Sequence, residues 1–461
     1  MTHQPTRRHV LHSLAAGSLL MPGILSELLA DSSGKDADPL TPKQPHFPAK
    51  AKRVIYIFSN GGVSHMDTFD HKPELFKADG KLTGIGGGLS NQQRVLLKPL
   101  WQFRPGGECG TLVSDLFPYL REHCMDDIAL IKSMKSDDNE HYNATLAMHT
   151  GSFFFSRPSI GAWVSYGLGT YNQNLPSFIV LAQQLPYAGT QVYANDFLPA
   201  YHQGVRVVPG ATPIINLDPR TPQPSVQQLE LGFADELNRR HLADRSGDQE
   251  LAARIKTFET AFHMQTDARE AFDLGQETEE TLGLYGLKPG QTDGFAWKCL
   301  VARRLAERGV RFIELIDGSS SHNWDQHGDM AEHAEHAKAV DQPIAGLLRD
   351  LKRRGMLDET LVVWTTEFGR TPGVDGVKGR GHHGACFSSW MAGGGVKGGI
   401  SYGSTDELAA TVAENKVHVH DFHATILALM GIDHTKLTYR HAGRDFRLTD
   451  VHGNVVNEIM A

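Results

Sequence analysis

Short apolar runs alternate with stretches of helical hydrophobic spacing along most of the chain. Residues 53–58 (RVIYIF) form the first apolar run, and its length and continuity predict a buried strand. Two later segments each read as a helix, a glycine and a strand. They cover 295–308 with 310–316, and 331–354 with 361–366. Further strands are expected at 128–134 and 178–181, and a closing helix at 419–430. This alternation predicts an α/β fold with a largely parallel sheet covered on both faces.

Polar residues follow three of the predicted strands directly. They occupy 60–67, 317–327 and 367–370. Ligands of parallel sheets bind at the carboxyl ends of the strands, so we expect these three segments to meet at one site. The segment 183–290 is less regular, and we interpret it as an insertion or a cap over the sheet within a single domain of residues 51–461.

The N-terminal residues have the features of a targeting signal rather than of a part of the folded domain. Arg7 and Arg8 precede a mostly apolar stretch from Val10 to Ala30, which predicts a twin-arginine signal over residues 1–30. Residues 31–50 are rich in Pro, Asp, Ser and Lys and are expected to be a linker. An ordinary amphipathic helix is the alternative. The signal predicts export to the periplasm or beyond, and no other run approaches the roughly 20 apolar residues of a membrane span.

Charge and composition exclude some classes of protein. With 45 basic and 53 acidic residues the net charge is −8, so the chain lacks the footprint of a nucleic-acid binder. Four cysteines are spread without C-x-x-C spacing, which argues against a zinc ribbon and leaves buried thiols or disulfides open. The 24 histidines are roughly double the usual share, and many are clustered, which indicates metal chemistry.

The densest cluster follows the predicted strand 310–316. His322, Asp325 and His327 offer the nitrogen and oxygen ligands that zinc or manganese takes. The alternative is a solvated loop in which these residue types occur by chance. In the helix that follows, His333 and His336 are expected to face water.

Two further segments carry candidate chemistry. Glu367 and Arg370 lie three apart after a predicted strand, where the carboxylate could bind metal and the guanidinium an anionic substrate; a structural ion pair is the alternative. His382 and His383 are adjacent in a Gly-rich loop. Adjacent imidazoles usually point apart, so at most one of them is expected to be a direct ligand.

Several ordered motifs together resemble the bacterial domain of unknown function 1501 family. They are residues 53–70, RPSIG at 157–161, WDQH at 324–327, EFGRTP at 367–372 and GRDFRLTDV at 443–451. The resemblance covers about residues 50–455. The family is related to the alkaline phosphatase superfamily, which includes sulfatases, and so implies an alkaline-phosphatase-like three-layer α/β/α sandwich. It does not by itself imply an activity.

The resemblance also implies roles for individual residues. The segment 141–151 is similar to the one that begins with the superfamily's nucleophile, but His141 stands where Ser, Thr or Cys is expected. His141 is therefore a candidate nucleophile, ligand or general base. The first-strand aspartate resembles Asn60, with Asp67 as a substitute, and the last histidine ligand resembles His383. One intact and one eroded metal site are expected, with zinc or manganese preferred over calcium or magnesium.

The leading hypothesis is an exported, metal-dependent hydrolase of phosphate or sulfate esters. Asp325, His327 and His383 would hold the metal, Arg370 the anion, and His141 would face the substrate. The alternative is a non-catalytic protein that binds anionic polysaccharide or partner proteins. The sequence leaves the oligomeric state open.

Overall fold

A central sheet organises the computed structural model, which describes residues 39–83, 94–215, 223–245 and 247–461. Its strands lie in the order β14, β6, β13, β10, β1, β9, β7, β8, and β17 also pairs with β6. Their bounds are β1 Arg53–Ser59, β6 Ile128–Lys135, β7 Phe178–Leu181, β8 Val205–Val207, β9 Phe312–Asp317, β10 Thr360–Thr365, β13 Phe387–Ala392, β14 Ile400–Tyr402 and β17 Val417–His418. Only β13 runs antiparallel to its neighbours in this sheet, so the predicted parallel character is confirmed.

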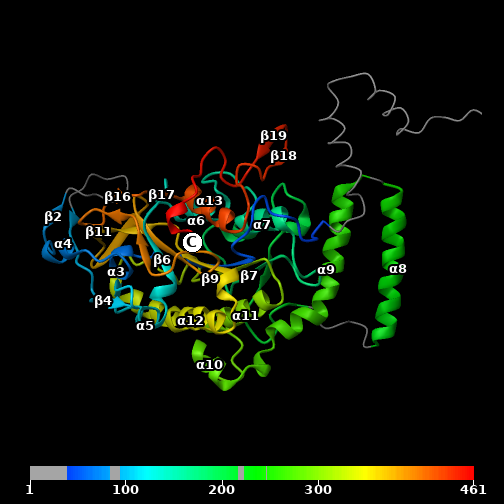
Figure 1. Ribbon diagram of the computed structural model, residues 1–461, viewed down its shortest axis with the longest axis horizontal. Helices are drawn as coiled ribbons and strands as arrows, with labels where there is room; N and C mark the ends of the chain where they lie inside the picture. Colours follow the sequence, from blue (N-terminus) through cyan, green and yellow to red (C-terminus); the bar gives the residue numbers. More distant parts are fainter. Residues whose placement is uncertain (1–38, 84–93, 216–222, 246) are drawn as a thin grey trace, which may run out of the picture.

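Helices cover both faces of the sheet and make it the middle of three layers (Figure 1). On one face lie α5 (Pro118–His123), α10 (Glu279–Tyr285), α11 (Gly294–Glu307) and α12 (His333–Arg353). On the other lie α6 (His141–Thr150), α7 (Ile160–Leu168) and α13 (Val419–Leu429). The predicted α/β fold is therefore confirmed.

Alternation along the strands explains the two cores. In β1, Ile55 and Ile57 belong to the core beneath α11 and α12, whereas Val54, Tyr56 and Phe58 belong to the core beneath α7 and α13. All five side chains are fully buried. A strand buried on both faces needs apolar residues at successive positions, which is why the sequence shows continuous runs.

The segment 183–290 contributes to both the sheet and the periphery. Its strand β8 extends the sheet beside β7. Its helices α8 (Pro224–Ala243) and α9 (Gln249–Phe272) form an antiparallel pair at one end of the molecule, and α8 is the outer one (Figure 1). This arrangement leaves the side chains of Leu229 and Phe233 on α8 largely exposed.

Short elements complete the fold. They are α3 (His65–Thr68), α4 (Pro73–Lys77) and the hairpins β2 (Leu82–Thr83) with β3 (Arg94–Val95), β4 (Phe103–Gly106) with β5 (Thr111–Ser114), β11 (Gly369–Asp375) with β12 (Gly379–His383), β15 (Ser404–Thr405) with β16 (Val412–Glu414), and β18 (Tyr439–His441) with β19 (Arg444–Phe446). The β11–β12 hairpin follows β10 directly. It therefore lies over the carboxyl edge of the sheet.

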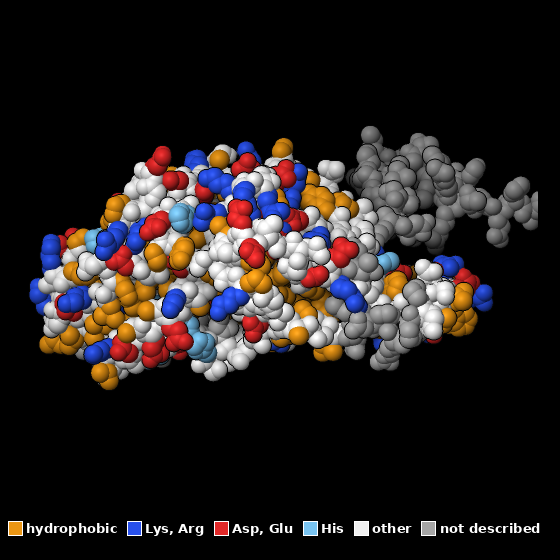
Figure 2. Space-filling view, turned by 90° about the horizontal axis from the view of Figure 1, so that it is seen from below, with side chains coloured by type: hydrophobic (Ala, Val, Ile, Leu, Met, Phe, Trp, Pro, Cys, Tyr) orange, Lys and Arg blue, Asp and Glu red, His pale blue; other side chains and the backbone are white. Residues whose placement is uncertain are grey.

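Other predictions concern the surface, the cysteines and the N-terminus. The face seen in Figure 2 intersperses basic and acidic side chains, as expected from the modest net charge. The four cysteines, all within the described residues, are free thiols, and Cys109 is the exposed one. No helix in the described part of the chain is long and apolar enough to cross a membrane. The predicted signal over residues 1–30 lies outside the described residues.

Candidate metal centre

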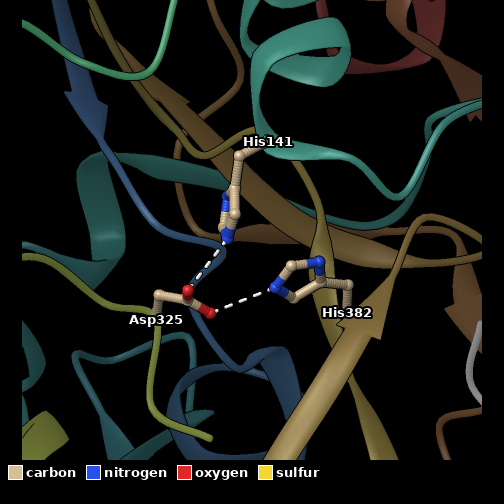
Figure 3. A group of neighbouring side chains, drawn as sticks. All are labelled: His141, Asp325 and His382. Carbon is tan, nitrogen blue, oxygen red and sulfur yellow. Dashed lines mark hydrogen bonds and ion pairs between the residues drawn. The ribbon is translucent and has the colours of Figure 1, made fainter. Parts of the chain in front are cut away.

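Three distant chain segments bring His141, Asp325 and His382 together at the carboxyl edge of the sheet. His141 is the first residue of α6, Asp325 lies in the loop after β9, and His382 lies on β12. Figure 3 shows the three side chains pointing toward one another. One ligand atom from each lies within 4.8 Å of the others, so the group could hold a metal ion.

Asp325 is the centre of this cluster because His327 also reaches it. The Asp325 Oδ1 atom lies 2.9 Å from His327 Nε2 and 3.1 Å from His382 Nε2. The two imidazole nitrogens are themselves 2.9 Å apart. These three atoms thus form a triangle with sides of about 3 Å. The side between the two imidazole nitrogens needs a proton or a cation, because two nitrogen lone pairs would otherwise face each other.

His141 is held from its other side by a buried carboxylate. Its Nδ1 lies 2.7 Å from Glu367 Oε1, and Glu367 also accepts hydrogen bonds from the Gly61 amide and the Thr366 hydroxyl. The His141 Nε2 atom lies 3.2 Å from Asp325 Oδ2, yet it is buried without a hydrogen bond of good geometry. Glu367 therefore orients an imidazole whose second nitrogen faces the cluster.

Aromatic rings enclose His141. Tyr187 stacks on its ring with centroids 4.0 Å apart, and Phe368 packs at 4.8 Å. The Tyr187 hydroxyl accepts a hydrogen bond from Asn323. These contacts fix the plane of the His141 ring without supplying charge.

Arg370 is fully buried, and most of its donors are used within the protein. It donates to the backbone carbonyls of Gly61, Gly62 and Arg380, and its Nη2 lies 2.5 Å from Asp325 Oδ1. These bonds tie the loop after β1 to the cluster. Arg370 thus anchors Asp325 and adds positive charge beside the donor triangle.

The charges of the cluster shift its pKa values in opposite directions. Burial lowers the pKa of His141, but the nearby carboxylates of Asp325 and Glu367 outweigh it, and the net shift is upward. The hydrogen bond to Asp325 raises the pKa of His327. Burial lowers the pKa of His382. Burial also acts to raise the pKa of Asp325, but three imidazoles and Arg370 favour its carboxylate form, and the net shift is strongly downward.

Four predicted ligands lie outside the cluster. The ring of His383 bonds the Ala410 carbonyl, because neighbours on a strand point to opposite faces and His382 takes the inner one. Asp67 is paired with buried Arg380 at 2.7 Å. Asn60 donates to the Ser319 carbonyl, and the His322 ring packs on His336. The geometry thus favours His382 over His383 and provides no second assembled site among the described residues.

The structure also adds residues and corrects one expectation. Asp375 holds His327 Nδ1 at 2.6 Å, and the Asn139 carbonyl holds His382 Nδ1 at 2.8 Å. Both are remote in sequence from the imidazoles they orient. His333 and His336 are buried, so the prediction that they face water was wrong. They share the buried stripe of α12 with Ala337 and Val340, a helical spacing visible in the sequence.

The donor set fits a divalent cation of the zinc or manganese type. A tetrahedral ion with bonds of about 2.0–2.1 Å has ligand atoms about 3.3 Å apart, close to the triangle of Asp325, His327 and His382. His327 and His382 each donate a hydrogen bond from Nδ1 to an oxygen atom, and such a bond usually supports a histidine ligand. The unpartnered Nε2 of His141 lies beside the same carboxylate.

Fold and site together define an α/β protein with a candidate metal centre at the carboxyl edge of its sheet. The model of the family described as protein of unknown function (DUF1501) matches residues 51–460. The chain therefore belongs to this family, as the sequence motifs predicted. No curated protein matches it.

Solved structures overlap with the chain at low identity. The lipoteichoic acid synthase LtaP from Listeria monocytogenes is 9% identical with a TM-score of 0.38, over 89% of this chain and 79% of that one. The alkaline phosphatase from the Antarctic bacterium TAB5 is 11% identical with a TM-score of 0.31, over 84% and 99%. The PsFucS1 sulfatase from Pseudoalteromonas sp. is 12% identical with a TM-score of 0.35, over 88% and 70%.

Proposed function

We propose that the chain is a metal-dependent hydrolase of phosphate or sulfate esters. The observation that carries the proposal is the convergence of Asp325, His327 and His382 on one point beside the unpartnered nitrogen of His141. A divalent cation bound there would polarise an ester oxygen and lower the pKa of a bound water.

The position of the cluster favours an anionic substrate. His141 begins the ten-residue helix α6, whose dipole favours anions at its N-terminus, where the Glu140 carboxylate already accepts a hydrogen bond from the Asn143 N–H group. Arg370 adds a buried positive charge at Asp325. A bound cation would offset the carboxylates of Asp325 and Glu367, so that a phosphate or sulfate group could bind beside Arg370.

His141 is suited to carry a proton. Glu367 fixes its Nδ1, so proton exchange with the substrate or with water would take place at Nε2. The nearby hydroxyl groups of Ser64 and Thr68 are buried and donate to Asp67 and to a backbone carbonyl. We therefore favour direct hydrolysis over a covalent intermediate on a hydroxyl side chain.

The test uses two neighbouring histidines as a matched pair. The purified protein is analysed for bound metal and assayed on aryl phosphates and aryl sulfates, together with His382→Gln and His383→Gln. Loss of metal and turnover in the first variant alone supports the proposal. Loss in His383→Gln alone would move the metal site to the sequence-based choice. A metal-free, inactive protein would favour the alternative, a binding module for anionic polysaccharide.

We also propose export by the twin-arginine route, based on Arg7 and Arg8 before the apolar stretch. Replacing both arginines with lysine should keep the chain in the cytoplasm of a bacterial host, whereas the unchanged chain should reach the periplasm. Equal distribution of the two in cell fractions would contradict the proposal.

A further inference from the structure

A further cavity is lined by none of the residues of the candidate metal centre. Its volume is about 360 Å³, and it lies between the N-terminus of α11, the end of β9 and α12. The residues that give it chemical character are Asp293, Lys298, Asp317, His322 and His336. A cavity of this size is at the lower end of the range for small-molecule sites.

One side of the cavity is positive. Asp293 precedes α11, a helix of 14 residues, but its side chain caps none of the first-turn N–H groups. Lys298, one turn further on, is 6% exposed and donates to the Ile316 carbonyl. Its ammonium group also lies over the Phe295 ring, 4.9 Å from the centroid, and has no second hydrogen-bond acceptor among the described residues. A buried ammonium group beside a free helix N-terminus is an arrangement that binds anions.

An unpartnered imidazole supplies a second, independent observation. His336 is 7% exposed and lines the cavity. Its ring packs on His322 and Trp324, and no hydrogen bond joins it to any described residue. The His336 ring is thus placed at the cavity, where water or a ligand would be the partner of its nitrogens.

Two carboxylates also line the cavity and limit the choice of ligand. Asp317 accepts from the Trp324 indole at 2.8 Å and from the Ser59 hydroxyl at 3.3 Å, both through Oδ2, and Asp293 is exposed at the mouth. These oxygens would repel a bare anion but accept hydrogen bonds from hydroxyl groups. The complementary ligand thus carries one anionic group and neighbouring hydroxyl groups.

We infer that this cavity binds an acidic sugar unit, with its anionic group at Lys298 and the α11 N-terminus and its hydroxyl groups toward Asp317. His322 in the cavity wall is followed by Asn323, which donates to Tyr187, and Tyr187 stacks on His141. The cavity is therefore placed to hold a neighbouring unit of a substrate that reacts at the metal centre. Only this last step rests on the proposed function.

The test measures binding of D-glucuronate by calorimetry to the full chain in EDTA, with D-glucose and inorganic sulfate as comparison probes. Lys298→Met removes the ammonium, and His336→Phe keeps a ring of similar size without its nitrogens. Lys397→Met is the matched control, because that lysine also donates to a backbone carbonyl but lies outside the cavity. Loss of a charge-assisted hydrogen bond should weaken binding about tenfold or more in the first two variants and not in the control.

Several results would overturn the inference. They are no saturable binding of glucuronate, equal binding by His336→Phe and the unchanged chain, or sulfate binding as tightly as glucuronate. If Lys298→Met does not fold, His336→Phe decides alone. Glucuronate binding in EDTA by a chain that shows no turnover would separate the two proposals. It would support the ligand site in the cavity and contradict the proposed hydrolase activity.

Discussion

Buried, uncharged histidines should make the protein sensitive to acid, and His202 gives the cleanest test. Its side chain is 1% exposed, and its Nδ1 shares a hydrogen bond of 2.7 Å with the hydroxyl of Ser165. Burial lowers the pKa of His202 to about 3, from an ordinary value of 6.5. It lies in the core beneath α7, away from the candidate metal centre, so its titration reports on stability alone.

The sign and size follow from proton linkage. Below pH 6.5 the unfolded chain binds a proton at His202 that the folded chain does not bind, so the free energy of unfolding falls as the pH falls. The slope approaches about 1.4 kcal/mol per pH unit and continues down to the folded-state pKa of about 3. Between pH 7 and pH 5 this one residue should lower the free energy of unfolding by about 2 kcal/mol.

His202→Gln isolates this contribution, because glutamine keeps hydrogen-bonding capacity toward Ser165 but cannot gain a proton. Urea unfolding followed by tryptophan fluorescence at pH 7, 6 and 5 gives the free energy for both chains. The difference between them should change by about 2 kcal/mol across the range, in favour of the variant at low pH. Parallel curves for the two chains would refute the reasoning.

Three further predictions concern the site and the core. Glu367→Gln should lower metal affinity or turnover about 10- to 100-fold, because it weakens the hold on His141; unchanged kinetics and metal titration would contradict this. Asp350→Ala should cost about 3 kcal/mol or more in urea unfolding, because the buried Asp350 carboxylate joins Arg303 to Arg354 and to the Tyr285 hydroxyl; a smaller loss would show that Glu277 and Glu307, which also pair with Arg303, are sufficient without it. Zinc at 100 times its Kd should add about 2.7 kcal/mol to the stability of the unchanged chain but not of His382→Gln, as measured by calorimetry; an equal gain would place the metal elsewhere.

The layers of the fold could be predicted because a strand that is buried on both faces requires a continuous run of apolar residues. The run 53–58 predicts β1 to within one residue, and 178–181 matches β7. The antiparallel direction of β13 (FSSWMA) could not be predicted, since nothing in its local sequence indicates the direction of a strand. Burial of His336 was missed because a polar residue type was given more weight than its helical spacing.

The candidate site was predictable only in part. Asp325 and His327 follow a strand, and the carboxyl edge of a parallel sheet is where such residues meet. The choice between His382 and His383 depends on which face of β12 each residue occupies, and this register is set by pairing with β11 rather than by local sequence. Nothing in the sequence indicated that Tyr187 would stack on His141, because Tyr187 lies in an irregular loop whose path is determined by the whole fold.

Five histidines of this chain show two contrasting environments, and the contrast supports the functional interpretation. His65, His202 and His423 are buried and have a pKa lowered to about 3, as expected for imidazoles placed in a core. The pKa values of His141 and His327 are shifted upward instead, because carboxylates surround them. Gathering several carboxylates and imidazoles at one point is costly for folding, and a bound cation offsets that cost. His141 and His327 are therefore candidates for chemistry together with His382, whose pKa is lowered by burial although Asp325 opposes the shift.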